Sequence, residues 1–230
     1  MKRLGLLGGM SWESSIEYER WINQEVRARL GGTASADLVI RSFNFADIEA
    51  MQEAGDWATA GRTLAAAAHD LQNSGAEAIL LCTNTMHKVF DQIQAAVDVP
   101  LLHIADATAD AVRARGVDRV ALLGTRYTME QSFYADRLRT AGLHVLIPEE
   151  PDRTMIHDVI YSELVQGIVS PESKRQYLQA IEHLVDAGAE GVIAGCTEIE
   201  LLVAPEDVSV PYFPTAFLHA QAAASFALEL

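Results

Sequence analysis

The two cysteines, Cys82 and Cys196, are the side chains best suited to proton-transfer chemistry in this sequence. Each stands where a short apolar run ends and a helical pattern begins. A thiol at a helix N-terminus meets the positive end of the helix dipole and backbone N–H donors, so we expect both pKa values to lie below the ordinary value of about 8.5. Such a group is a base when ionised and an acid when protonated. The competing interpretation is a small buried apolar residue, the commonest role of an isolated cysteine.

An internal repeat makes the two cysteines equivalent. The segment GAEAILLCTNT, which contains Cys82, resembles GAEGVIAGCTE, which contains Cys196. Residues 4–8 (LGLLG) resemble residues 120–124 (VALLG) at nearly the same separation. We infer two similar α/β halves related by a pseudo-two-fold axis, with the thiols on opposite walls of a cleft between them. Two acid/base groups on opposite faces of a substrate remove a proton from one side and return one from the other, which inverts a stereocentre.

Short apolar runs alternate with helical patterns along the whole chain. This alternation predicts parallel βαβ units with helices on both faces of each buried sheet. Strands are expected near residues 3–7, 38–42, 78–82, 100–103, 119–123, 144–147, 191–194 and 210–213. Helices are expected near residues 14–30, 57–74, 85–97, 105–115, 129–141, 155–166, 171–188, 198–202 and 215–230. With the repeat, the prediction is an N-terminal domain of residues 1–98 plus 208–230 and a second domain of residues 99–207.

The composition bounds the kind of protein. Of the 230 residues, 50% are hydrophobic, and 17 basic against 32 acidic side chains give a formal charge of −15. The length is enough for a full core, and an acidic surface repels nucleic acid and anionic lipid, so neither is an expected partner. No apolar run reaches the roughly 18–20 residues that span a membrane. Residues 4–10 fit a first strand better than a signal peptide, and we expect a cytoplasmic protein.

Other chemistry has less support. The glycine-rich residues 5–11 lack the spacing of a dinucleotide or phosphate loop; they either bind a carboxylate at a helix N-terminus, aided by Asn84 and Thr85, or simply allow a tight turn. Lys88 is the one candidate for a Schiff base, and the helical pattern turns it away from the sheet edge, so no cofactor is expected. The histidines form no metal motif, so no metal is expected. His87 either tunes the nearby thiol or lies on a helix surface.

Three segments together carry a family resemblance. They are GLLGGMS at residues 5–11, LCTNTMH at residues 81–87 and AGCTEIE at residues 194–200. As a set they resemble the cofactor-independent aspartate/glutamate racemase family, and GGMSWES with CTNTMHK resembles its broad-specificity amino-acid racemase branch. The resemblance implies an isomerase of amino acids that needs no pyridoxal phosphate. It also implies two flavodoxin-like α/β/α domains with the active site in the cleft between them, and a homodimer.

The resemblance also implies roles for individual residues. Cys82 and Cys196 would be the two catalytic bases, Cys82 for the D-enantiomer and Cys196 for the L-enantiomer. The substrate-binding positions would be Met10, Ser11, Asn84, Thr85, Thr125 and Thr197. The second cysteine motif reads Cys-Thr-Glu where glutamate racemases have Cys-Thr-His, which favours the aspartate side of the family.

One departure concerns the substrate side chain. Aspartate racemases of the family hold the distal carboxylate with an Arg and a Lys, where this chain has Ile48 or Glu49 and Val165, and neither Arg41 nor Arg126 matches the motif. A carboxylate without a counter-charge is costly to bury. Aspartate, glutamate and a neutral polar amino acid such as homoserine therefore all remain candidate substrates. The alternatives are a single-cysteine decarboxylase or cis–trans isomerase of the same superfamily, and a non-catalytic small-molecule sensor.

Overall fold

The computed structural model describes residues 1–229, which form two compact units. Unit 1 comprises Met1–His103 and the segment from His219 onward, and unit 2 comprises Ile104–Leu218. These junctions differ from the expected ones at 98/99 and 207/208. The reason is backbone pairing. The strand that contains Leu101 pairs with the strand of Ile79 in unit 1, and the strand that contains Tyr212 pairs with the strand of Val192 in unit 2, so each junction falls after these strands.

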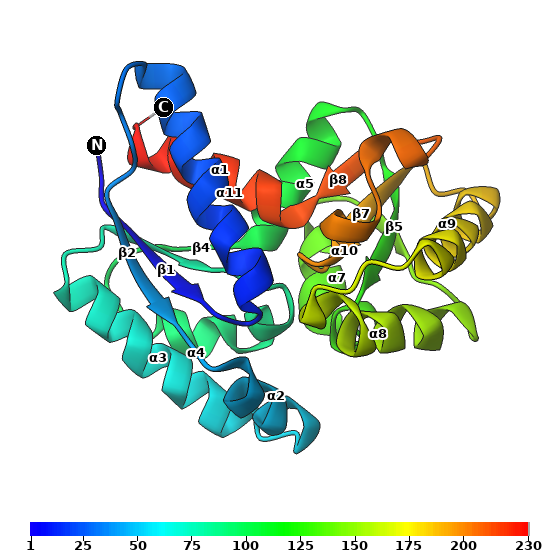
Figure 1. Ribbon diagram of the computed structural model, residues 1–230, viewed down its shortest axis with the longest axis horizontal. Coiled ribbons are helices and arrows are strands. Elements are labelled where there is room, and N and C mark those ends of the chain that lie inside the picture. The colour runs from blue at the N-terminus through cyan, green and yellow to red at the C-terminus, as the bar shows by residue number, and fades with distance from the viewer. Residues whose placement is uncertain (230) are drawn as a thin grey trace. The chain divides into compact units, whose positions relative to one another are not determined.

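Unit 1 contains a four-stranded parallel sheet in the order β2-β1-β3-β4 (Figure 1). The strands are β1 (Leu4–Gly8), β2 (Leu38–Ser42), β3 (Ala78–Leu81) and β4 (Leu101–Leu102). The helices are α1 (Trp12–Leu30), α2 (Phe45–Glu53), α3 (Trp57–Asn73), the 3-10 helix η1 (Thr85–Val89), α4 (Phe90–Gln94) and most of α11 (Thr215–Ala227). Helices α1 and α11 cover one face of the sheet and α3 with α4 the other (Figure 1).

Unit 2 contains a second four-stranded parallel sheet in the order β6-β5-β7-β8. The strands are β5 (Arg119–Gly124), β6 (His144–Leu146), β7 (Gly191–Gly195) and β8 (Tyr212–Pro214). The helices are α5 (Ile104–Ala114), α6 (Arg126–Glu130), α7 (Ser132–Thr140), α8 (Asp152–Ser162), η2 (Leu164–Gln166), α9 (Pro171–Asp186), α10 (Ile199–Leu202) and η3 (Pro205–Asp207). The two sheets share one strand order, which confirms the α/β fold class and agrees with the internal repeat.

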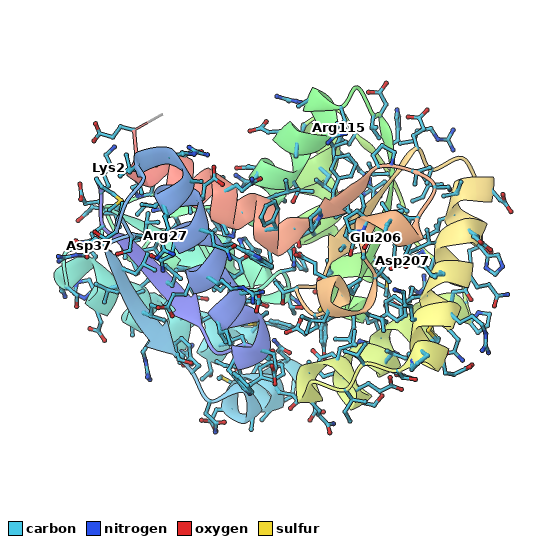
Figure 2. All side chains as sticks on the ribbon, turned by 45° about the horizontal axis from the view of Figure 1, so that its top comes forward. Lys2, Arg27, Asp37, Arg115, Glu206 and Asp207 are labelled. Atoms are coloured by element: carbon cyan, nitrogen blue, oxygen red, sulfur yellow. The ribbon has the colours of Figure 1, made fainter. Side chains whose placement is uncertain are left out.

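The repeated Gly-Ala-Glu sequence has a structural role at the start of each sheet. In unit 1, Glu77 accepts a hydrogen bond from the backbone N–H of Arg3 at 3.0 Å, and the Arg3 guanidinium donates to the Ser74 carbonyl at 3.1 Å. In unit 2, Glu190 and Arg119 repeat this pattern at 3.2 and 3.1 Å. The unit 1 arginine also pairs with Asp37, which precedes β2 and is labelled in Figure 2. The repeat therefore joins the end of a helix to the starts of two neighbouring strands.

Amphipathic helices close both faces of each sheet. In α3, Leu64 and Leu71 face the sheet at helical spacing and pack with Leu7 and Leu81 in one core cluster. Alternate strand residues face opposite sides, so in unit 2 one cluster gathers β5 and β7 residues with α8 and α9, and another gathers them with α5 and α7. Each buried leucine contributes about 1.5–3 kcal/mol to folding.

Several helices differ from the sequence expectation, and the one expected over residues 155–166 is divided at Glu163 into α8 and η2. Helix α2 was not predicted, because only Ile48 and Gln52 of its nine residues are buried and the apolar periodicity is correspondingly weak. The helix expected over residues 85–97 begins instead as a 3-10 turn before α4. The helix expected over residues 129–141 is split, because Gln131 has extended backbone between α6 and α7. Among the described residues, no helix has both the length and the apolar character to cross a membrane.

Candidate active site

In unit 1 the predicted site residues gather at the carboxyl edge of the sheet. Strands β1 and β3 are neighbours, with Leu7 paired to Leu81, while the chain leaves β1 toward β2 on the other side. This reversal is the topological switch point at which α/β proteins bind ligands. Buried residues follow these two strands: Met10 and Ser11 after β1, and Cys82, Asn84 and Thr85 after β3.

Gly9 shapes the turn from β1 into α1. Its φ is +83°, and a Cβ there would lie 2.3 Å from the backbone oxygen of Phe43, so only glycine fits. The N–H of Gly9 donates to the Ser15 hydroxyl at 2.7 Å, and that hydroxyl donates to the Ser11 carbonyl at 2.7 Å. The Ser11 side chain makes no capping bond. Ser15, which the sequence analysis missed, therefore orders the turn; a hydroxyl in the first turn of the helix is the signal that could have indicated it.

In unit 2 the corresponding residues gather at the equivalent edge. Gly124 at the end of β5 pairs with Gly195 at the end of β7, so the residues that follow these strands are close neighbours. Thr125 caps α6 by accepting from the Thr128 N–H at 3.3 Å. Cys196 and Thr197 follow β7 and are buried. Both cysteines thus occupy the same topological position, each in its own unit.

The expectation of lowered thiol pKa values is wrong. Burial raises the pKa of the Cys82 thiol, and burial together with the Glu198 carboxylate raises the pKa of the Cys196 thiol. The reason is that a thiolate loses its hydration in the interior. The helix dipole offsets little of this cost, because the helices that follow, η1 and α10, have only five and four residues.

Glu198 is the contact of Cys196 to which the sequence analysis gave no role. The Cys196 Sγ donates to Glu198 Oε2 at 3.0 Å, and the Thr197 hydroxyl donates to the same oxygen at 2.8 Å. All three residues are buried. The signal was present in the sequence, because an acidic residue two positions after a cysteine at a sheet edge lies within reach of the thiol.

The histidine and lysine after Cys82 are not on a free helix surface. His87 is buried, its Nδ1 bonds to the Thr83 carbonyl at 2.7 Å, and its ring lies 4.5 Å from that of His103. A carbonyl only accepts, so this Nδ1 carries the hydrogen. Lys88 lies over the Trp57 ring, 3.9 Å from its centroid. Within residues 1–229, no three His, Cys, Asp or Glu side chains are arranged to hold a metal ion.

The positions expected to select the substrate side chain are apolar or engaged elsewhere. Ile48 is buried in the unit 1 core, and Val165 packs against the unit 2 core. Arg41 lies over the Phe43 ring at 4.9 Å, and Arg126 is 3.9 Å from a carboxylate oxygen of Glu130. Ile48 and Val165 therefore provide no counter-charge for a substrate carboxylate.

Comparison with known proteins assigns the family. A sequence model described as Asp/Glu/Hydantoin racemase matches residues 7–223. A crystal structure of a candidate Asp/Glu racemase from Yersinia pestis is 53% identical, with 99% of this chain and 100% of that chain covered and a TM-score of 0.92. An aspartate racemase homologue from Pyrococcus horikoshii OT3 is 35% identical, with the same coverage and a TM-score of 0.86.

A curated relative extends the likeness to enzymes of wider specificity. The broad specificity amino-acid racemase RacX of Bacillus subtilis (strain 168) is 25% identical over 137 residues, which are 58% of this chain and 57% of RacX. The family match spans nearly the whole sequence and includes both cysteine motifs. The chain therefore belongs to the Asp/Glu/hydantoin racemase family and is an enzyme of the amino-acid racemase class.

Proposed function

We propose that this protein racemises a small amino acid at Cα without a cofactor, with Cys82 and Cys196 as the two acid/base groups. The observation that carries the proposal is the equivalence of the two cysteines. Cys82 directly follows β3 and Cys196 directly follows β7, and these strands hold the same place in their two sheets. Inversion of one carbon needs an acid/base group on each of its two faces. Two similar units, each supplying one thiol at its ligand-binding edge, meet that need.

The proton transfers balance without any further reactant. One thiolate takes the proton from Cα, the electron pair stays on the substrate, and the opposite thiol gives its proton to the other face of the same carbon. Burial favours this chemistry, because a thiolate of raised pKa is a stronger base toward the weakly acidic Cα–H. The accompanying cost is a smaller thiolate fraction at neutral pH.

The other predicted residues have binding roles in this proposal. Ser11, Asn84 and Thr85 in unit 1 offer polar groups near Cys82, and Thr125 and Thr197 do so near Cys196. Met10 supplies an apolar contact. We assign the substrate α-carboxylate and α-amino group to these positions, since hydroxyl and amide groups both donate and accept hydrogen bonds.

A neutral polar side chain suits the substrate best. Ile48 and Val165 offer no counter-charge to a substrate carboxylate, and a carboxylate without a counter-charge is costly to bury. The broad specificity named for RacX agrees with this assignment. We therefore propose homoserine or a similar amino acid ahead of aspartate and glutamate. A homodimer in solution stays a prediction that light scattering would check.

The test is chiral chromatography after incubation with single L-amino acids, without added pyridoxal phosphate, in deuterated water. Racemisation with deuterium at Cα is expected for the parent, and its loss is expected in both Cys82→Ala and Cys196→Ala. Either variant racemising at the parent rate would refute the two-base mechanism. Activity confined to aspartate would refute the side-chain assignment. Carbon dioxide release or alkene isomerisation would identify the single-cysteine alternatives, and ligand binding without turnover would identify a sensor.

A further inference from the structure

The two thiols differ in what lies beside them. The Cys196 thiol donates to the Glu198 carboxylate at 3.0 Å, and Thr197 donates to the same oxygen. In the repeat, the position that corresponds to Glu198 is Asn84, whose amide carries no charge. A negative charge in contact with the thiol therefore belongs to one half of the molecule and not to the equivalent place in the other.

This contact controls the proton on Cys196. Deprotonation would place a thiolate 3.0 Å from a carboxylate in a buried setting, and two like charges at that separation repel strongly. It would also remove the hydrogen that the carboxylate accepts. For Cys82, burial opposes the thiolate but no carboxylate contributes to the shift. When one of the two cysteines is ionised and the other is protonated, the proton is therefore on Cys196 and the thiolate is Cys82.

We propose that Glu198 is a positioning residue that keeps Cys196 protonated, so that Cys196 is the proton donor of the resting enzyme and Cys82 is its base. This inference rests on the proposed two-thiol mechanism. The resting form accepts the enantiomer whose Cα–H faces Cys82. After one turnover Cys82 holds the proton taken from the substrate, Cys196 is a thiolate, and a proton must move from Cys82 to Cys196 through solvent to restore the resting form.

The sequence contains only two cysteines, so single substitutions isolate each thiol. We would titrate the far-ultraviolet absorbance of the thiolate in Cys82→Ala and in Cys82→Ala with Glu198→Gln. The glutamine keeps the size of the side chain and an acceptor oxygen but removes the charge. The Cys196 midpoint is expected to fall by about one pH unit or more in the double variant. In Cys196→Ala, the same Glu198→Gln change should move the Cys82 midpoint much less.

An unchanged or raised Cys196 midpoint, or an equal fall for both thiols, would overturn the proposal. Should the glutamine variant not fold, Glu198→Ala supplies a second neutral replacement with the same expectation. The titration needs no substrate, so it separates failure of this inference from failure of the proposed function.

Kinetics give a second readout that a purely structural role would not move. The equilibrium constant between enantiomers is one, so kcat/KM must be equal in the two directions for any variant. Glu198→Gln alone is therefore expected to change the ratio of the two kcat values and the ratio of the two KM values together, by the same factor of several-fold. Parent-like ratios in both would also overturn the proposal.

Discussion

Replacing Gly9 with alanine is expected to destabilise the protein more than the same change at Gly31. Both glycines have positive φ, +83° and +76°, so both alanines carry backbone strain of roughly 1–3 kcal/mol. A Cβ at Gly31 meets nothing within 4 Å, whereas a Cβ at Gly9 would lie 2.3 and 2.4 Å from backbone atoms of Phe43. Backbone atoms cannot rotate away, so overpacking adds about 1–3 kcal/mol at Gly9 alone.

The assay is guanidinium unfolding of Gly9→Ala and Gly31→Ala, compared with the parent. Subtracting one loss from the other cancels the shared strain and the shared effect on the unfolded chain. The expected difference is the clash term, about 1–3 kcal/mol in favour of the Gly31 variant. The turn that Gly9 shapes also carries Met10 and Ser11, so racemase activity should fall in the Gly9 variant only. Equal destabilisation, or equal activity, would refute the steric account of this turn.

Two further predictions concern titration and the core. The hydrogen bond to Asp152 at 2.7 Å raises the pKa of His183, so this contact stabilises the fold below about pH 6.5, and the stabilisation is lost as the pH rises through the raised value. Burial lowers the pKa of His157, so in NMR titrations His183 should have a higher midpoint than His157. The Asp152→Asn substitution should lower the His183 midpoint. A lower midpoint for His183 than for His157 would contradict the effect of this contact. Leu64→Ala, in the unit 1 core, should cost about 2–5 kcal/mol in denaturant unfolding, while the exposed Ile16→Ala should cost less than about 0.5 kcal/mol; similar losses would contradict the assigned burial.

Local pattern was enough to predict most elements and their order. Apolar runs bounded by turn residues located all eight strands within residues 1–229, because a strand buried in a parallel sheet is marked by a short continuous apolar stretch. The repeat around Cys82 and Cys196 indicated two similar halves, and each sheet has the same strand order. Helix α2 was not predicted, because two buried side chains do not produce a detectable helical periodicity of apolar residues.

Residue type and spacing in the sequence determined the fold class, the equivalent positions of Cys82 and Cys196, and the racemase resemblance. Only the tertiary structure decided the proton affinity of those thiols. A helix start suggested a lowered pKa, but burial raises it in both, and Glu198 raises it further in Cys196. Desolvation and charge depend on which atoms surround a group in three dimensions. Likewise, β4 belongs to unit 1 and β8 to unit 2 because each hydrogen-bonds to a strand that is distant in the sequence.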